Sequence, residues 1–161
     1  MEWLNISIAE IVKWLLHRVG MKSHYSKEGL EQYRRAREES RRARLASYED
    51  EREHAEHLAR IAIRQAIRLG LPDKQEWFYA AKLAEELGEF ESAVRAFQKV
   101  ARGRSRLALE ATVGLAEMWA RQGRSTEAKE LAVRVLKSYP DPCEAKELLE
   151  LLRELCLGEN R

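Results

Sequence analysis

The chain has 161 residues, of which 35% are charged and 45% hydrophobic, and its formal net charge is only +2. A chain of this length can bury a core of its own as one domain. The small net charge excludes a global field that would favour nucleic acid or an acidic membrane, and the many charged residues suit long solvated helix faces.

The first predicted helix runs from Trp3 to Val19 and is amphipathic. Its apolar face consists of Leu4, Ile8, Ile11, Val12, Leu15 and Val19, while Trp3 and Trp14 lie together elsewhere on its surface. Burying six such side chains is worth about 9 kcal/mol or more, so another surface must cover this helix. The alternatives are a cap on the following helices, self-association, a partner groove or a membrane surface. We predict assembly through Trp3, Leu4, Ile8, Ile11, Trp14 and Leu15.

Seven more helices are predicted, because apolar residues recur at helical spacing and glycines close the stretches. They lie near Ser26 to Ser47, Glu51 to Leu69, Asp73 to Leu87, Glu89 to Arg102, Ser105 to Arg121, Ser125 to Ser138, and Pro142 to Leu157. Between Ser47 and Asp50 no Gly or Pro breaks the chain, so the flanking helices are either separate or one. No strand pattern competes, and the expected fold class is all-α.

Two stretches of the chain repeat the same pattern of residues. Trp77, Gly88, Phe90, Ala93 and Phe97 are followed by Leu115, Trp119, Gly123, Ala128 and Pro140. Gly88 and Gly123 are 35 residues apart, as are Ala93 and Ala128. A fainter copy consists of Ala59, Ile63 and Ala66. A fixed period of this length indicates helix pairs that stack and bury their apolar faces on one another.

These residues resemble the tetratricopeptide repeat family. Trp77 matches the aromatic position of the first helix, Gly88 and Gly123 the turn inside each hairpin, and Ala93 and Ala128 the close approach of the second helix. The resemblance implies a superhelix of antiparallel hairpins, with repeats at residues 73–105 and 106–141 and a degenerate repeat at 40–72. A capping helix is expected at 142–157. We therefore expect an amphipathic segment at 1–20 and a repeat domain at 26–161.

The family resemblance also implies a concave groove lined by the first helix of each repeat. Its register places the following residues on that face: Arg44, Tyr48, Gln75, Phe78, Lys82, Glu85, Val113, Glu117 and Arg121, with Arg41 and Glu110 beside them. A mixed apolar and charged lining suits a peptide segment or an amphipathic helix.

Arginines cluster between Arg34 and Arg44, and Arg60, Arg64 and Arg68 follow one another at one helical turn. Guanidinium groups bind phosphate in bidentate fashion, so an anion-binding module for nucleic acid or acidic membrane is the alternative function. Interleaved acids such as Glu38, Glu39 and Glu56 can instead neutralise these arginines by ion pairing within the chain. The aromatic residues typical of single-strand binders are missing from these segments.

Chemistry-bearing motifs are otherwise scarce. His54 and His57 lie one turn apart with Glu51, too few for a metal ligand set, and a solvated helix face is the simpler interpretation. No nucleophile or phosphate-loop motif is present, so neither an enzyme nor a cofactor is expected. Cys143 and Cys156 fall about 20 Å apart on one predicted helix and cannot pair. Because the first residues also do not resemble a signal peptide, we expect a reduced, cytoplasmic location.

The sequence therefore predicts a non-catalytic adaptor or scaffold that binds a protein segment in its groove, assembles through its first helix as a homo-oligomer or on a larger complex, or does both. Strong loss of affinity with added salt would favour the alternative, an anion-binding module for nucleic acid or membrane.

Overall fold

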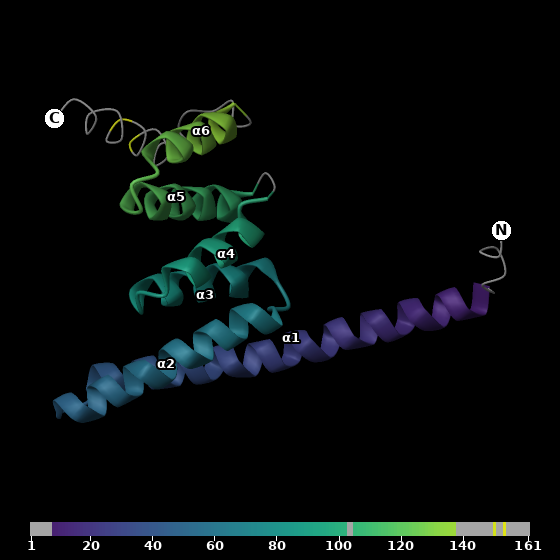
Figure 1. Cartoon of the computed structure of the whole chain (residues 1–161), viewed down its shortest axis with the longest axis horizontal. Coiled ribbons are helices and arrows are strands. Elements are labelled where there is room, and N and C mark those ends of the chain that lie inside the picture. Colours follow the sequence, from purple (N-terminus) through teal and green to yellow (C-terminus); the bar gives the residue numbers. More distant parts are fainter. Residues whose placement is uncertain (1–7, 103–104, 138–149, 151–152, 154–161) are drawn as a thin grey trace.

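The computed structural model describes the backbone of residues 8–102, 105–137, 150 and 153, and the side chains within these ranges from residue 26 onward. This part of the chain contains six α-helices and no strand. The helices are α1 (Ile8–Leu45), α2 (Glu49–Leu69), α3 (Lys74–Glu86), α4 (Phe90–Val100), α5 (Arg106–Arg121) and α6 (Ser125–Leu136). Each odd-numbered helix packs against the next, and the three hairpins stack in chain order (Figure 1).

Helix α1 differs from the prediction, because two expected helices, 3–19 and 26–47, are joined into one of 38 residues. Gly20 was expected to end the first of them. A single glycine inside a helix costs only about 1 kcal/mol relative to alanine, and no proline follows it, so the helix continues. The prediction of eight helices therefore contains one helix boundary, near Gly20, that the structure does not have. The C-terminal half of α1 pairs with α2, which supplies the first hairpin.

The uncertain boundary near Ser47 is a true break. Helix α1 ends at Leu45 and α2 begins at Glu49, with the N-cap residue Tyr48 in extended conformation. The two helices are therefore separate and antiparallel. The predicted capping helix at 142–157 lies outside the described residues apart from Glu150 and Arg153, both of which are helical.

Both repeats turn at a glycine with positive φ. Gly88 (φ 74°) lies between α3 and α4, and Gly123 (φ 76°) between α5 and α6. This left-handed backbone is open to glycine at little cost, which explains why the 35-residue spacing selects that residue type. The first helix of each repeat also begins at a side-chain cap: Asp73 accepts from the Glu76 amide at 2.9 Å, and Ser105 accepts from the Ala108 amide at 3.1 Å.

The main core runs through helices α1 to α5, with Phe97 of α4 fully buried at its centre. The Phe97 ring meets Phe78 of α3 edge to face, with 6.1 Å between centroids. Alanines fill most other core positions. Ala93 and Ala128 are both completely buried, as their place at the close approach of each hairpin predicts. A second, smaller cluster holds α5 and α6 together around Leu109, Ala116 and Ala132.

Candidate functional site

Two neighbouring stripes of side chains follow the C-terminal half of α1. The buried stripe consists of Tyr33, Ala36, Ser40 and Ala43, which face the other helices. One position further along the chain, Arg34, Arg37, Arg41 and Arg44 form a second stripe that is exposed. Both stripes have the spacing i, i+3, i+7, i+10, which keeps residues on one face of a helix. Packing the first stripe inward therefore aligns four guanidinium groups outward.

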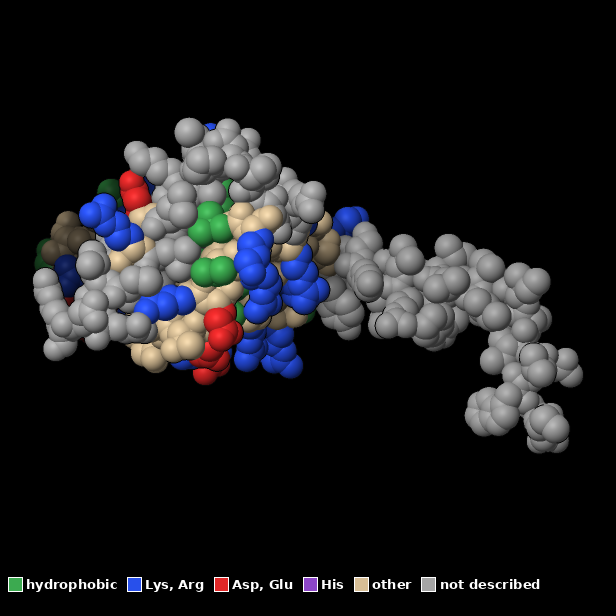
Figure 2. Space-filling view, turned by 90° about the horizontal axis from the view of Figure 1, so that it is seen from above, with side chains coloured by type: hydrophobic (Ala, Val, Ile, Leu, Met, Phe, Trp, Pro, Cys, Tyr) green, Lys and Arg blue, Asp and Glu red, His purple; other side chains and the backbone are tan. Residues whose placement is uncertain are grey.

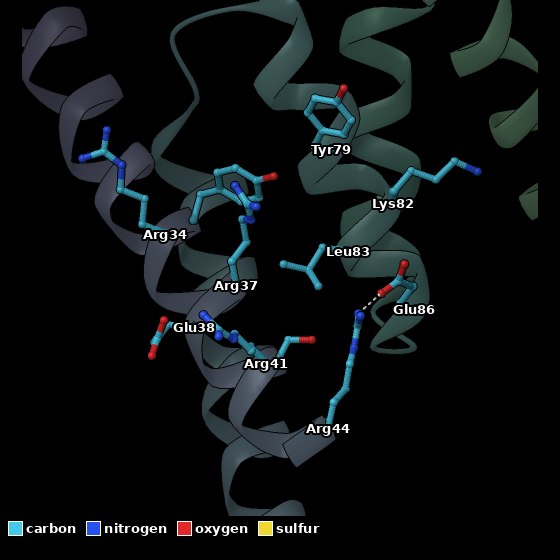
Figure 3. Close-up of a pocket in the computed structure, with 11 residues that line it drawn as sticks. Arg34, Arg37, Glu38, Arg41, Arg44, Tyr79, Lys82, Leu83 and Glu86 are labelled. Carbon is cyan, nitrogen blue, oxygen red and sulfur yellow. Dashed lines mark hydrogen bonds and ion pairs between the residues drawn. The ribbon is translucent and has the colours of Figure 1, made fainter. Parts of the chain in front are cut away.

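Helix α3 supplies the opposite wall. Tyr79, Lys82, Leu83 and Glu86 line the groove on this side; Leu83 and Glu86 point toward the arginine stripe, whereas the Lys82 side chain points away from it (Figure 3). Tyr79 is 51% exposed and stands edge to face with the buried Phe78. The Lys82 ammonium lies 5.6 Å from the centre of the Phe97 ring, a cation–π distance that holds the lysine stem along the helix.

The groove between α1 and α3 has a volume of about 670 Å³ and is basic. Its walls carry five cations (Arg34, Arg37, Arg41, Arg44 and Lys82) against two carboxylates (Glu38 and Glu86), a formal net charge of +3. Glu86 accepts a hydrogen bond from Arg44 Nη2 at 2.7 Å and closes one end (Figure 3). Arg37 lies 5.8 Å from the centre of the Tyr33 ring. We call this feature the basic groove.

The interleaved acids leave most of this charge in place. Glu38 and Glu39 pair with Arg42, Glu49 pairs with Arg52, and Glu56 pairs with Arg60. Among the described residues, none of Arg34, Arg37 and Arg41 has a carboxylate oxygen within 4.0 Å. The acids thus neutralise the arginines outside the groove, and the stripe inside it remains able to bind an anionic ligand.

One pKa shift occurs in the groove wall and another at the start of α3. Burial raises the pKa of the Tyr33 phenol, and the adjacent Arg37 guanidinium only partly offsets this effect, so the phenol is a neutral hydrogen-bonding group. Burial and the Asp73 carboxylate raise the pKa of Glu76, whereas Arg34 lowers it. Arg34 therefore also stabilises the charged form of a carboxylate at the start of α3.

The predicted groove residues fall into several groups. Lys82, Glu85 and Arg121 come together: Glu85 accepts from Arg121 Nη1 at 3.1 Å and lies 3.6 Å from the Lys82 ammonium. Val113 and Glu117 are partly buried on the same face of α5 as Arg121. Gln75 is exposed in the first turn of α3.

Four other predicted residues lie at three further places. Arg41 and Arg44 line the basic groove. Tyr48 lies at the α1–α2 turn and is 72% exposed. Glu110 pairs with Arg106 at 3.0 Å within α5.

Phe78 is a correction, because it was expected on the groove face and belongs to the core. It is 9% exposed and packs on Phe97. The short side chains of Ala80, Ala81 and Ala84 leave room that a large ring must fill, so α3 turns Phe78 inward. Its exposed neighbour Tyr79 takes the position at the groove.

The second arginine cluster does not join the groove. Arg60 pairs with Glu56 at 3.4 Å and Arg64 with Glu89 at 3.6 Å, and Arg68 lines a separate cavity with Glu28 and Gln32.

Of the predicted assembly residues, Trp3 and Leu4 lie outside the described residues. Ile8, Ile11, Trp14 and Leu15 belong to α1, but their side chains are not among those described.

The described part of the chain carries neither a group of metal ligands nor a helix suited to crossing a membrane. It contains no cluster of three or more potential metal ligands, and His54 and His57 are both exposed. No helix within it is both long and apolar enough to cross a bilayer. Viewed from the α6 end, Lys and Arg side chains gather beside hydrophobic ones on the described surface (Figure 2).

Five groove residues, Tyr33, Ser40, Tyr79, Leu83 and Glu86, were not singled out in the sequence. The signal that points to the groove is the arginine spacing on α1, next to Tyr33 and three small residues with identical spacing. The arginine spacing does not reveal which residues form the opposite wall, because that wall depends on how the first two hairpins stack.

Comparison with known proteins agrees with the fold. The family model described as Tetratricopeptide repeat matches residues 77–102 and 110–142, which cover most of the α3–α4 and α5–α6 hairpins. Neither a search of curated proteins nor a search of solved structures found a match. Tetratricopeptide repeats generally mediate protein–protein interactions and are typically non-catalytic scaffolds. Two stretches in tandem, within residues 77–142, are accordingly similar to tetratricopeptide repeats.

Proposed function

We propose that this protein is an interaction module whose basic groove binds an acidic segment of another protein. The observation that carries the proposal is the groove itself, with five cations against two carboxylates between α1 and α3. An extended or helical segment bearing several Asp or Glu residues can place carboxylates along the arginine stripe. Each guanidinium offers a planar pair of donors that matches a carboxylate.

The groove geometry favours a peptide over a single small anion. From Arg34 to Arg44 the stripe spans ten residues, or about 15 Å along α1. Tyr79 and Leu83 add an aromatic and an apolar contact on the facing wall, which suits a segment that combines acidic and apolar side chains. Because Arg44 already pairs with Glu86 and Lys82 with Glu85, the expected binding residues are Arg34, Arg37 and Arg41.

The experiment is a binding titration with fluorescent peptides. A ten-residue peptide rich in Glu and Leu is compared with a control peptide of scrambled order in which Lys replaces Glu. Both peptides are titrated against the wild-type protein and against its Arg37→Glu, Arg41→Glu variant. We expect the acidic peptide to bind and the variant to lose at least about tenfold in affinity, equivalent to about 1.4 kcal/mol. The variant Arg95→Glu, Lys99→Glu, with the same change of charge on exposed α4 positions, should bind as the wild type does.

The same titration addresses the anion-binding alternative. A single-stranded oligonucleotide and vesicles containing acidic lipid are tested beside the peptide at equal ionic strength. Preference for oligonucleotide or vesicle over peptide would overturn the proposal in favour of the alternative. Binding of the peptide that is equally strong in the groove variant would also overturn it, since the site would then lie elsewhere.

We further propose that the N-terminal half of α1 is an assembly arm. The supporting observation is length: α1 has 38 residues and α2 has 21, so α2 can cover only about 31 Å of a helix about 57 Å long. Figure 1 shows the N-terminal half of α1 extending away from the other helices. The sequence there repeats apolar residues at Ile8, Ile11 and Leu15, a spacing typical of a helix that packs on another helix.

The test of the arm is the variant Ile11→Lys, Leu15→Lys, measured by light scattering together with helicity. If the arm assembles copies of the chain, this variant should have a lower mass than the wild type at the same concentration. A matched control, Lys13→Ala, changes a polar position of the same segment and should leave the mass unchanged. Wild-type protein that is monomeric and captures no partner through this segment would contradict the proposal.

A further inference from the structure

The turn between α1 and α2 is an exposed, acidic projection. Residues 45–53, which we call the hairpin tip, extend beyond the end of α3 (Figure 1). None of them is buried, and Leu45 and Tyr48 are 71% and 72% exposed, more than any other large hydrophobic side chain in the described part. Two large apolar side chains exposed on one short projection indicate a contact surface.

The hairpin tip has the opposite charge to the basic groove. It carries Glu49, Asp50, Glu51 and Glu53 against the single cation Arg52, a formal net charge of −3. Acids in the first helical turn are favoured by the partial positive charge at a helix N-terminus, which accounts for the first three of these residues. It accounts neither for Glu53, beyond the first turn, nor for the exposed Leu45 and Tyr48.

We propose that the hairpin tip of a second copy of this chain occupies the basic groove. The inference rests on the proposed function of the groove and names the acidic segment that fills it. The net charge of −3 on the tip meets the net charge of +3 in the groove, and Leu45 and Tyr48 meet Tyr79 and Leu83. Such complementarity selects a partner and its orientation.

The order of the two surfaces along the chain allows a reciprocal contact. The groove residues of α1 end at Arg44, and the tip begins at Leu45, so the two surfaces are adjacent on one hairpin. When two copies lie side by side and antiparallel, each tip comes next to the groove of the other copy. The contact is then made twice around a two-fold axis, which closes as a dimer.

The decisive experiment is a charge swap followed by light scattering across a range of concentrations. The groove variant is Arg37→Glu, Arg41→Glu, and the tip variant is Glu51→Lys, Glu53→Lys. We expect the wild type to dimerise and each variant alone to have a dissociation constant at least about tenfold higher. Mixed in equal amounts, the two variants should form a heterodimer, because each then meets a surface of opposite charge. The four substitutions in one chain should likewise restore the homodimer.

Controls separate this contact from the other proposals. Arg95→Glu, Lys99→Glu matches the groove variant in charge and should dimerise as the wild type does. The series is repeated with Ile11→Lys, Leu15→Lys present, so that association through the arm does not mask the tip. Circular dichroism checks that every variant is as helical as the wild type.

Three results would overturn the inference: a monomeric wild type, variants of unchanged dimer affinity, or a mixture of variants that does not associate. If any of them occurs while the acidic probe peptide still needs Arg37 and Arg41, the groove function stands and only the identity of its occupant is wrong. If the probe peptide does not bind either, the proposed function itself fails.

Discussion

Arg44 of α1 and Glu86 of α3 form an ion pair at 2.7 Å across 42 residues of sequence. The preceding residue, Glu85, reaches the other way, to Arg121 of α5 at 3.1 Å. Two consecutive carboxylates at the end of α3 therefore connect three successive hairpins along one face. The sequence shows only a Glu-Glu pair before a turn.

These two ion pairs should differ in their contribution to stability. Arg44 and Glu86 are both well exposed, and such pairs contribute about 0 to 1 kcal/mol. Glu85 is much less exposed and also lies 3.6 Å from Lys82. We expect Glu85→Gln to lower the free energy of unfolding, measured in urea, more than Glu86→Gln does. Equal effects, or the reverse order, would contradict this assignment.

Close packing of the repeat hairpins depends on two fully buried alanines, Ala93 and Ala128. Replacing Ala93 with Leu adds volume where α4 meets α3 and should cost about 1 to 3 kcal/mol of stability. Lys99→Leu, at an exposed position of the same helix, serves as the control and should have little effect. An unchanged urea midpoint for Ala93→Leu would show that the helices can separate freely at this point.

Phe78 should behave as a core residue. Because it is nearly buried and packs on Phe97, Phe78→Ala should cost about 3 to 5 kcal/mol and lower the melting temperature strongly. Tyr79→Ala, which removes the exposed neighbouring ring, should leave stability almost unchanged while weakening the binding of the acidic peptide to the basic groove. If Phe78→Ala melts like the wild type, its ring contributes far less than its burial indicates.

The pH dependence of stability should include a contribution from Glu76. Its pKa is raised above the ordinary 4.5 by burial and by Asp73, so the folded state holds this proton more tightly than the unfolded state. The corresponding stability is present at pH values below the unfolded pKa and is lost as the pH rises through the folded pKa. Glu76→Gln should therefore gain on the wild type as the pH rises above about 4 to 5. A difference in unfolding free energy that does not vary with pH would contradict this.

The crossing of α1 and α2 gives a test in which the usual helix preference is reversed. A Cβ atom at Gly29 would lie 2.0 Å from the carbonyl oxygen of Gly70. Because both atoms are fixed to the backbone, neither can move aside without shifting a helix. Glycine to alanine inside a helix ordinarily gains about 1 kcal/mol, yet here Gly29→Ala should destabilise the hairpin. Lys27→Ala, an exposed change two residues earlier, is the control. A stabilised Gly29→Ala protein would show that the crossing can widen at no cost.

The repeat pattern predicted the α3–α4 and α5–α6 hairpins well because their turns need a particular residue. Gly88 and Gly123 adopt positive φ, and Ala93 and Ala128 sit at close approaches, so the backbone geometry selects these residue types. Gly20 carries no such requirement, since one glycine in a helix is tolerated. The sequence could therefore not distinguish a helix end from a continuous α1.

The basic groove could be predicted only in part. The arginine stripe of α1 is visible as a spacing, but whether acids neutralise it depends on side-chain directions that the spacing leaves open. Glu38 and Glu39 turn to Arg42, one residue away from the stripe. Phe78 and Tyr79 are adjacent and both aromatic, and only the volume left by the alanines around Phe97 decides which of them points inward. The assignments of partner residues and of domain boundaries remain predictions.

An unbroken α1 ties the rotation of the arm to that of the groove. Each residue inserted into a helix turns everything beyond it by about 100° and lengthens it by about 1.5 Å. One residue added between Val19 and Ser26 would thus point the apolar face of the arm in a different direction relative to the arginine stripe. Seven added residues would nearly restore the angle and move the arm about 10.5 Å outward. A partner bound to the arm and a partner bound in the basic groove are therefore held at a fixed rotation about the α1 axis, as well as at a fixed distance.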